Sequence, residues 1–376
     1  MYKMRSFRQF SRVKSTFLAS ETKIYKADAP KPHFSEDQPL VFGAIPTPHM
    51  LEIDYYGNSG WEAPVIKPFA PLSIHPFNSS LHYAIQCFEG MKAYKDPKNK
   101  IRFFRPQLNM ERFLVSSKRL GLPEFDTNEL FKCIEQYIKL EKDWIPELEG
   151  SSLYIRPLHI SNTNKLGVHK AKDSKILVMA SPAQEYFKKN SRGLWLDVNE
   201  NYWRGTPHSV SQYKLGCNYA PTITITSETA HEGYEQAIWT FNENMLESGA
   251  TNLFFLLQKD GKQTLVTHPL DGSILPGITR RSIIELAKDV VPDIKVEERS
   301  FSISEFIDCY NKKQIKEVFV AGTAAVTGGV SRLRIRGTVY ELPYGEVPNY
   351  FSTTFKKMIY NIQYGKIDHP FSVVCE

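Results

Sequence analysis

The chain has 376 residues, of which 41% are hydrophobic and 23% charged, and its formal net charge is +6. This is the composition of an ordinary globular protein with enough apolar material for about two domains. No apolar run approaches the about 18–20 residues that a membrane-spanning helix needs, so we expect no membrane partner. The five cysteines are scattered without a C-x-x-C pair, which argues against a disulfide scaffold or a thiolate zinc site and favours a reducing compartment.

The positive charge is concentrated at the amino terminus. Residues 1–20 contain five basic residues and no acidic one, so the rest of the chain carries only +1. This leaves no electrostatic reason to expect nucleic acid as a partner. Phe7, Phe10 and Phe17 recur at helical spacing among serines and arginines. Such an acid-free amphipathic segment is typical of a mitochondrial presequence, which we predict over 1–20; the alternative is a basic tail on a cytoplasmic protein.

The elements predicted after this leader fall into two blocks. An arm with three prolines over 21–41 leads into the first block, which extends to about residue 183. Apolar runs predict strands over 101–104, 153–160 and 176–180. Helical spacing of apolar residues predicts helices over 108–120 and 130–141. Asp126 and Glu129, three residues apart, are consistent with a capping box at the start of the second helix.

The polar segment 184–193 is predicted to be an interdomain linker. The second block, 194–376, combines predicted strands and helices without a regular β-α-β alternation. The strands are expected over 194–198, 237–241, 253–257, 264–267 and 317–320, and the helices over 279–291, 304–312 and 349–362. This mixture predicts an α+β fold rather than a doubly wound parallel sheet.

The segment 205–227 is the most informative part of the sequence. Lys214 is its only formally charged residue, where an average composition would give about five. Burial disfavours the charged form of a lysine and makes its neutral, nucleophilic amine accessible, as a Schiff-base lysine requires. A lysine that reaches the surface from an apolar strand would produce the same pattern, so this observation alone leaves both interpretations open.

Three other features point towards a site for a phosphorylated cofactor. Leu275-Pro276-Gly277-Ile278-Thr279 precedes a helical pattern, with Thr279 a plausible cap, and free N–H groups at a helix start suit phosphate. Glu247 lies between two strand-like runs, and Gly322-Thr323 follows another. Alone, these would be an ordinary helix cap and ordinary turns. Together with a Schiff-base lysine, they are what a pyridoxal 5'-phosphate enzyme needs.

Other common sites find no support in the sequence. It contains no glycine-rich nucleotide loop and no G-x-S-x-G nucleophile motif. The ten histidines lack metal-ligand spacing, so we expect no metal.

The residues resemble the branched-chain amino acid aminotransferases, which are pyridoxal phosphate enzymes of fold type IV. The match runs from about 39 to 365. It includes Phe88-Glu89-Gly90-Met91-Lys92-Ala93, Leu153-Tyr154-Ile155-Arg156-Pro157, Tyr213-Lys214-Leu215-Gly216, Asn218-Tyr219, Glu247-Ser248-Gly249, Ile274-Leu275-Pro276-Gly277 and Gly322-Thr323-Ala324. The resemblance implies a smaller N-terminal α/β domain over 21–183 and a larger, mixed pseudo-barrel domain over 194–376 that binds the cofactor.

The resemblance also implies a role for each site residue. Lys214 would form the Schiff base, Glu247 would face the pyridine nitrogen, and Tyr219 would hydrogen-bond the phenolic oxygen. The phosphate would be held by Arg105, the backbone N–H groups of Ile278 and Thr279, and the Thr323 hydroxyl. The substrate would be bound by Phe42, Tyr83, Phe88, Tyr154, Arg156, Val168 and Ala324, with Arg156 serving glutamate and with Tyr83 and Val168 crossing the interface of a homodimer.

The implied reaction is the reversible transamination of leucine, isoleucine and valine with 2-oxoglutarate. D-Amino acid aminotransferases, aminodeoxychorismate lyases and a non-catalytic binding module are the alternatives. Two departures from the family are visible. Ala325 and Gly328 replace the C-x-x-C pair of vertebrate members, so no thiol switch is expected there. Ala250, followed by Thr251, stands where the family often has threonine.

Overall fold

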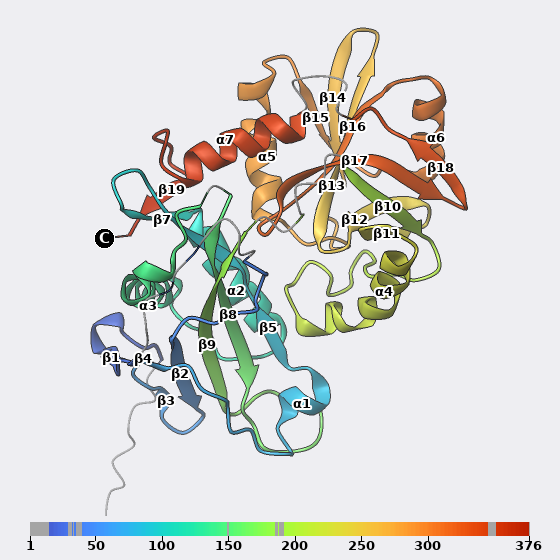
Figure 1. Ribbon diagram of the computed structural model, residues 1–376. Helices are drawn as coiled ribbons and strands as arrows, with labels where there is room; N and C mark the ends of the chain where they lie inside the picture. Colours follow the sequence, from blue (N-terminus) through green and yellow to red (C-terminus); the bar gives the residue numbers. More distant parts are fainter. Residues whose placement is uncertain are drawn as a thin grey trace, which may run out of the picture.

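The computed structural model describes residues 15–28, 32, 34, 40–148, 150–184, 187, 192–344 and 351–375. These residues form two domains, each built on one large sheet (Figure 1). The α+β mixture expected from the sequence is confirmed. No helix in these ranges is both long and apolar enough to span a bilayer.

The first domain contains a ten-stranded, mainly antiparallel sheet in the order β1-β4-β2-β9-β8-β6-β7-β19, with β3 beside β2 and β5 beside β8. Its strands are β1 (Lys23–Ile24), β2 (His49–Tyr56), β3 (Gly60–Trp61), β4 (Val65–Pro68), β5 (Gln86–Phe88), β6 (Met91–Lys95), β7 (Ile101–Phe104), β8 (Ser152–Ser161), β9 (Ser174–Ala183) and β19 (Ser372–Val374). Its helices are α1 (Ser79–Tyr83), α2 (Pro106–Arg119) and α3 (Thr127–Leu140), and a short 3-10 helix, η2 (Lys142–Trp144), follows α3.

Helix α3 shows how the sequence pattern produces the packing. Its predicted stripe is buried against the sheet and α2: Leu130, Phe131, Ile134, Tyr137 and Ile138. Asp126 caps the helix by accepting hydrogen bonds from the N–H groups of Asn128 and Glu129. The capping box is only half formed, because the Glu129 carboxylate turns instead to the N–H of Ala19, 2.7 Å away.

The second domain contains a nine-stranded sheet that partly closes on itself. Its strands are β10 (Leu194–Asn199), β11 (Gln236–Phe241), β12 (Asn244–Ser248), β13 (Thr251–Lys259), β14 (Lys262–Thr267), β15 (Lys295–Glu298), β16 (Ile315–Gly322), β17 (Val326–Ile335) and β18 (Thr338–Glu341). Because β12 pairs with both β11 and β13, the six strands β12-β11-β10-β17-β16-β13 form a closed ring. This ring is the pseudo-barrel that the resemblance implied.

Four helices surround this barrel: α4 (Ile223–His231), α5 (Ile278–Val290), α6 (Ile303–Asn311) and α7 (Phe351–Gln363). Helix α4 contacts β11, while α5 and α7 contact each other and β16. The segment 205–227, which could have been a strand, instead contains the 3-10 helices η3 (Gly216–Asn218) and η4 (Ala220–Thr222) before α4 begins. Irregular backbone of this kind places its side chains without the alternation of a strand.

The domain boundaries differ from the prediction at both ends of the chain. Strand β19 pairs antiparallel with β7, so residues 372–374 complete the sheet of the first domain rather than belonging to the second. At the other end, the short 3-10 helix η1 (Ala19–Glu21) follows Phe17, which is fully buried, with its ring edge-on to Trp61 at 5.3 Å between centroids. A boundary at residue 20 therefore cuts through the hydrophobic core. Most of the predicted linker 184–193 and residues 1–14 of the predicted presequence lie outside the described ranges.

Candidate active site

A cavity of about 330 Å³ lies between the two domains. Most of the predicted site residues line it: Phe42, Phe88, Tyr154, Arg156, Lys214, Tyr219, Glu247, Ile278, Thr279, Thr323 and Ala324. Arg105, Tyr83 and Val168 do not. The cavity thus collects residues that are up to 282 positions apart, from Phe42 to Ala324, at one place in the fold.

Lys214 is fixed at the domain interface by its own backbone. Its N–H donates to Ser116 Oγ at 3.0 Å, and its carbonyl accepts from the N–H of Phe88 at 3.0 Å. The Nζ atom donates to Tyr219 Oη at 3.2 Å and lies 4.9 Å from the centroid of the Phe88 ring. The amine is therefore half-buried between a phenol and an aromatic face.

Tyr219 responds to the charges that surround it. Burial would raise the pKa of its phenol, but the positive charges of Lys214 and Arg204 outweigh burial and lower it. The phenol end of the cavity is consequently favourable for negative charge.

Glu247 lies near the end of β12 and is 2% exposed. One oxygen, Oε1, accepts from the N–H of Leu275 at 2.8 Å and from Asn252 Nδ2 at 3.1 Å. The other oxygen pairs with Arg204. Burial raises the pKa of this carboxyl, and the neighbouring Arg204 opposes that rise. A buried, ionisable carboxylate of this kind can hold a proton on a nitrogen base.

The start of α5 forms the other end of the cavity. The N-cap is Gly277 rather than Thr279, and no side chain caps the helix. A side chain at position 277 is excluded, because a Cβ would lie 2.0 Å from Asn252 Oδ1. The first N–H groups of the helix, including those of Ile278 and Thr279, are therefore available for an anion.

The structure places Arg112, and not Arg105, beside this helix start. The Arg105 guanidinium forms a salt bridge with Glu285 at 2.7 Å, donates to Ser282 Oγ at 3.2 Å, and stacks 3.9 Å from the centroid of the Phe371 ring. These contacts on α5 and near the carboxyl terminus hold it outside the cavity. The prediction for Arg105 therefore has to be corrected.

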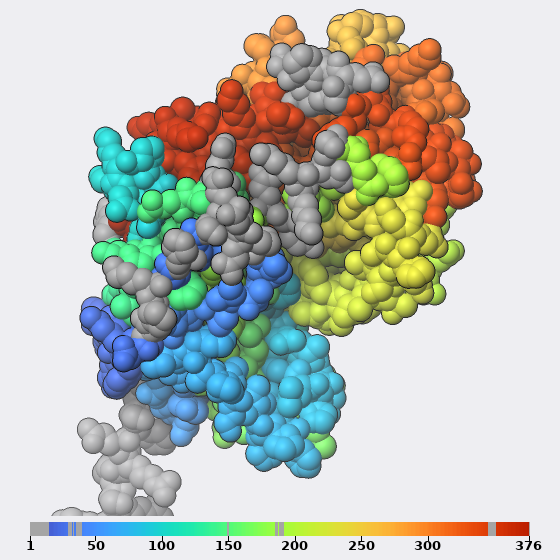
Figure 2. Space-filling model, viewed as in Figure 1, coloured from blue at the N-terminus to red at the C-terminus, as the bar shows by residue number. Residues whose placement is uncertain are grey.

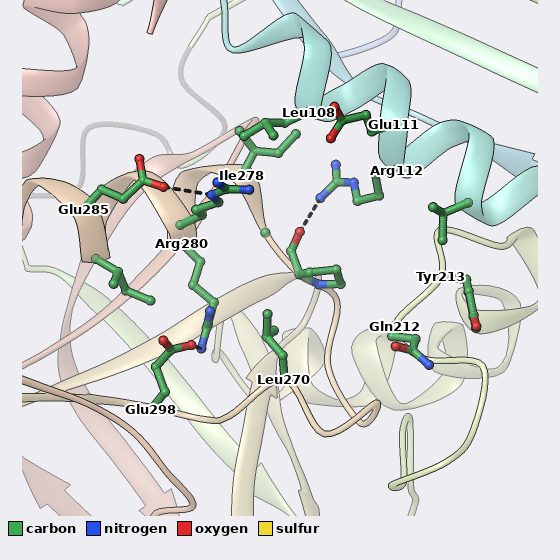
Figure 3. A pocket seen from close by; sticks show the side chains of 15 residues that line it. Leu108, Glu111, Arg112, Gln212, Tyr213, Leu270, Ile278, Arg280, Glu285 and Glu298 are labelled. Atoms are coloured by element: carbon green, nitrogen blue, oxygen red, sulfur yellow. Dashed lines mark hydrogen bonds and ion pairs between the residues drawn. The ribbon is translucent and has the colours of Figure 1, made fainter. Parts of the chain in front are cut away.

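Arg112 lies two turns further along α2 and lines the cavity. Its guanidinium donates two hydrogen bonds to the carboxylate of the fully buried Glu89, from Nε at 2.9 Å and from Nη2 at 2.6 Å. Its Nη1 donates to the carbonyl of Pro276 at 3.0 Å. Figure 3 looks into a neighbouring open pocket of about 580 Å³ between α2 and α5, which Arg112 and Ile278 also line. Nothing in the local sequence distinguishes Arg112 from Arg105 as the residue that reaches the cavity.

Aromatic rings and a second arginine form the side of the cavity nearest the first domain. Phe42 and Tyr154 meet edge-to-face at 4.6 Å. The Arg156 guanidinium lies 4.7 Å from the centroid of the Phe88 ring, and its Nη2 donates to Tyr154 Oη at 3.1 Å. Its buried Nε–H has no hydrogen-bond partner among the described residues. The wall thus combines apolar rings with one unsatisfied cationic donor.

Tyr83 and Val168 lie together at the end of the first domain, away from the cavity of their own chain. The N–H of Gly167 donates to Tyr83 Oη at 2.7 Å. Val168 is 86% exposed. The surface near α1, light blue in Figure 2, lies at the end of the molecule away from the barrel. In the single chain these two residues make no contribution to the cavity.

The donor set fits pyridoxal phosphate. A lysine amine beside a phenol, a buried carboxylate, and an arginine next to an uncapped helix start match the aldehyde, phenolic, pyridine and phosphate groups of that cofactor. The described residues contain no cluster of three or more histidine, cysteine, aspartate or glutamate side chains that could hold a metal ion. Sequence reasoning missed Arg112, Arg204 and Gln236, of which the first and third line the cavity.

Comparison with known proteins assigns the chain to a family. Residues 86–333 match the family described as amino-transferase class IV. The cytosolic branched-chain-amino-acid aminotransferase of Rattus norvegicus is 40% identical, over 95% of this chain and 88% of that protein. The mitochondrial one of Bos taurus is 38% identical, over 95% and 92%.

A solved structure agrees with these relatives. The branched-chain amino acid aminotransferase of Escherichia coli superposes with a TM-score of 0.69 at 25% identity, covering 86% of this chain and 99% of that one. On this evidence the chain belongs to the class IV aminotransferases and, within them, to the branched-chain-amino-acid aminotransferases.

Proposed function

We propose that this protein catalyses the reversible transfer of the amino group of leucine, isoleucine or valine to 2-oxoglutarate, giving the branched-chain 2-oxo acid and L-glutamate. The observation that carries the proposal is the position of the Lys214 amine, 3.2 Å from Tyr219 Oη in a cavity that the buried Glu247 also lines. When bound there through Lys214, pyridoxal phosphate supplies an electron sink for the bonding electrons of the substrate Cα–H bond.

The residues of the chain then have the following roles. Lys214 binds the cofactor covalently and moves the proton at the substrate Cα. Glu247 keeps a proton on the ring nitrogen, and Tyr219 donates to the phenolic oxygen. Arg112, in place of Arg105, holds the phosphate together with the N–H groups of the α5 start and the Thr323 hydroxyl.

The same pocket has to accept two kinds of side chain. The rings of Phe42, Phe88 and Tyr154 provide an apolar surface for an aliphatic chain. Arg156 provides the buried Nε–H that can pair with the side-chain carboxylate of glutamate. We place the substrate α-carboxylate at the backbone of Thr323 and Ala324, where the Ala324 carbonyl is already held by Lys92 Nζ at 3.0 Å.

We further propose a homodimer in which Tyr83 and Val168 of one protomer complete the cavity of the other. Both residues are exposed, and they are accompanied by the exposed apolar side chains of Phe77 and Leu81. A patch of this kind is typical of an interface between protein chains. Dimerisation would therefore both cover the patch and close the substrate pocket.

The relatives include cytosolic and mitochondrial proteins, and we propose mitochondrial import for this chain. The basic residues of the leader all lie within 3–14, whereas Phe17 belongs to the core. Cleavage would therefore occur before Phe17. Fusion of residues 1–16 to a fluorescent protein tests this, with uniform cytosolic fluorescence as the contradictory result.

A coupled assay for glutamate formation tests the proposed reaction. Leucine, isoleucine, valine and D-alanine serve as amino donors with 2-oxoglutarate. The three branched-chain donors should exceed D-alanine, and Lys214→Ala should abolish turnover without changing the circular dichroism spectrum. D-alanine as the best donor would overturn the substrate assignment.

A further inference from the structure

Glu247 has more partners than a site for one ring nitrogen requires. A carboxylate offers about four lone-pair positions. Leu275 N–H and Asn252 Nδ2 use two of them on Oε1, and Arg204 Nη1 uses one on Oε2. One lone-pair position of the Glu247 carboxylate remains for a group in the cavity. The three existing hydrogen bonds fix the orientation of the carboxylate and therefore the direction of this lone pair.

Arg204 is the charged member of this set. Both side chains of the Arg204–Glu247 pair are 3% exposed, so the pair is shielded from solvent. Arg204 does not line the cavity itself. Its guanidinium also lies 5.5 Å from the centroid of the Tyr219 ring. The buried Arg204 cation therefore contacts Glu247 on the side away from the cavity. It also lies beside Tyr219, the residue that contacts Lys214.

The backbone around Arg204 is held against the loop that carries the second partner of Glu247. Position 205 must be glycine, because a Cβ there would lie 2.3 Å from the carbonyl oxygen of Ser273. Ser211 Oγ donates to the carbonyl of Arg204 at 3.3 Å. Ser273 is two residues before Leu275, whose N–H contacts Glu247. The arginine and the amide donor are thus positioned together.

We propose that Arg204 is a positioning residue that holds Glu247 ionised and aimed at the cofactor ring, and that its charge also acts on Tyr219. This inference rests on the proposed function, because it takes Glu247 as the partner of the ring nitrogen. Arg204 itself touches neither substrate nor cofactor. The same proposal explains why a fully buried carboxyl can serve as an anion.

The electrostatics around Glu247 support this role. Burial raises its pKa, and the charged groups facing it are Arg204 from the loop after β10, Lys214 from the segment before η3, and Arg112 from α2. Tyr219 faces it as well. Of the three cations, Lys214 becomes bound to the cofactor and Arg112 forms a salt bridge with Glu89. Arg204 is the one that contacts the Glu247 carboxylate directly.

The test is the pH titration of the visible absorbance of the cofactor-loaded protein, which reports the protonation of the Lys214–cofactor linkage and does not depend on turnover. In Arg204→Gln the Glu247 carboxyl should become neutral and the ring nitrogen should lose its proton. Two positive charges and the negative charge of Glu247 would then be gone, a net loss of one positive charge, so the linkage should hold its proton to higher pH, by about one pH unit. Arg204→Lys keeps a charge and should restore about half of that shift.

Arg102→Gln is the matched control, because it also removes a largely buried guanidinium, paired at 2.8 Å with Asp96 in the first domain. It should lower the melting temperature but leave the titration unchanged. If Arg204→Gln does not fold, Arg204→Gln/Glu247→Gln, which leaves no buried charge unpaired, is compared with Glu247→Gln. A smaller upward shift, transmitted through Tyr219, is then expected.

Each outcome has one meaning. If the wild-type protein develops no Lys214-dependent colour with pyridoxal phosphate, the proposed function fails. If it does, but Arg204→Gln or the double variant titrates like its reference, only the inference about Arg204 is overturned. A shift of equal size in the Arg102→Gln control would also overturn it, because the effect would then be that of any lost buried charge.

Discussion

The choice between Arg112 and Arg105 as the phosphate-binding arginine can be tested by replacing each with lysine. A guanidinium has five N–H groups. Glu89 takes two of those of Arg112, and the Pro276 carbonyl takes a third. Two remain for the cofactor phosphate. Arg105 is instead paired with Glu285 outside the cavity.

The expected magnitude follows from this count. A hydrogen bond to a charged group contributes about 1.5–3 kcal/mol. Lysine retains the charge that neutralises Glu89 but cannot present the paired fork. Losing the equivalent of one such bond should weaken the binding of pyridoxal phosphate about 10- to 150-fold in Arg112→Lys. Arg105→Lys should bind pyridoxal phosphate with a dissociation constant within about twofold of that of the wild type, because Arg105 lies outside the cavity and each tenfold change needs about 1.4 kcal/mol.

The assay is titration of the apoprotein with pyridoxal phosphate, followed by tryptophan fluorescence and visible absorbance, to obtain the dissociation constant. Thermal melts of both apoproteins show whether any loss of affinity comes from partial unfolding. A loss in Arg105→Lys that equals or exceeds the loss in Arg112→Lys would refute the assignment and restore the prediction made from the sequence.

Three further predictions concern stability and assembly. Phe17→Ala should destabilise the fold by about 3–5 kcal/mol, because the buried ring packs against Trp61. In thermal melts the control Leu18→Ala, which truncates an exposed neighbour, should change the melting temperature little. Equal losses of melting temperature in the two variants would contradict the packing of Phe17. Burial raises the pKa of Glu317 from 4.5 to about 7, so the folded state binds its proton more tightly and this group's contribution to stability falls as pH rises from about 4.5 through 7. Glu317→Gln should remove that part of the pH dependence of the melting temperature, and an unchanged slope would contradict it. Val168→Asp should convert a dimer to a monomer in analytical ultracentrifugation, and a dimer that persists would place the interface elsewhere.

Regular elements with a clear period were predictable from the sequence. The stripe on α3 was found where expected, because burial of one face imposes a spacing that the residues display. The apolar runs of β7 and β8 were also found where expected. The three-residue strand β19 has too few positions to show a period. Its place beside β7 is decided by where the chain returns in space.

The sequence was a better guide to the reactive residue of the site than to the ion pairs that position the residues around it. Lys214 stands out in the sequence because the segment 205–227 around it contains no other charged residue. Arg105 precedes α2 as its N-cap residue, and Arg112 lies seven positions later on that helix. Which of them reaches the cavity depends on their ion-pair partners, Glu285 and Glu89, which lie in different parts of the fold. The Arg105–Glu285 pair is set by the packing of the two domains and the Arg112–Glu89 pair by packing within the first domain, and neither leaves a local pattern in the sequence.

Phe17 shows the same limit at the amino terminus. The absence of acidic residues over 1–20 made the whole segment resemble a leader. The cost of exposing one aromatic ring, however, depends on its contact with Trp61, 44 residues further along the chain. Composition could indicate a leader but could not show where the core begins.

The central claim, that Lys214 carries the cofactor, is tested most directly by reduction with borohydride followed by peptide mapping. The protein loaded with pyridoxal phosphate should lose its colour irreversibly, and the phosphopyridoxyl label should be found on the peptide that contains Lys214. Lys214→Ala, treated in the same way, should carry no label. A label on another lysine, or a wild-type protein that takes up none, would contradict the account.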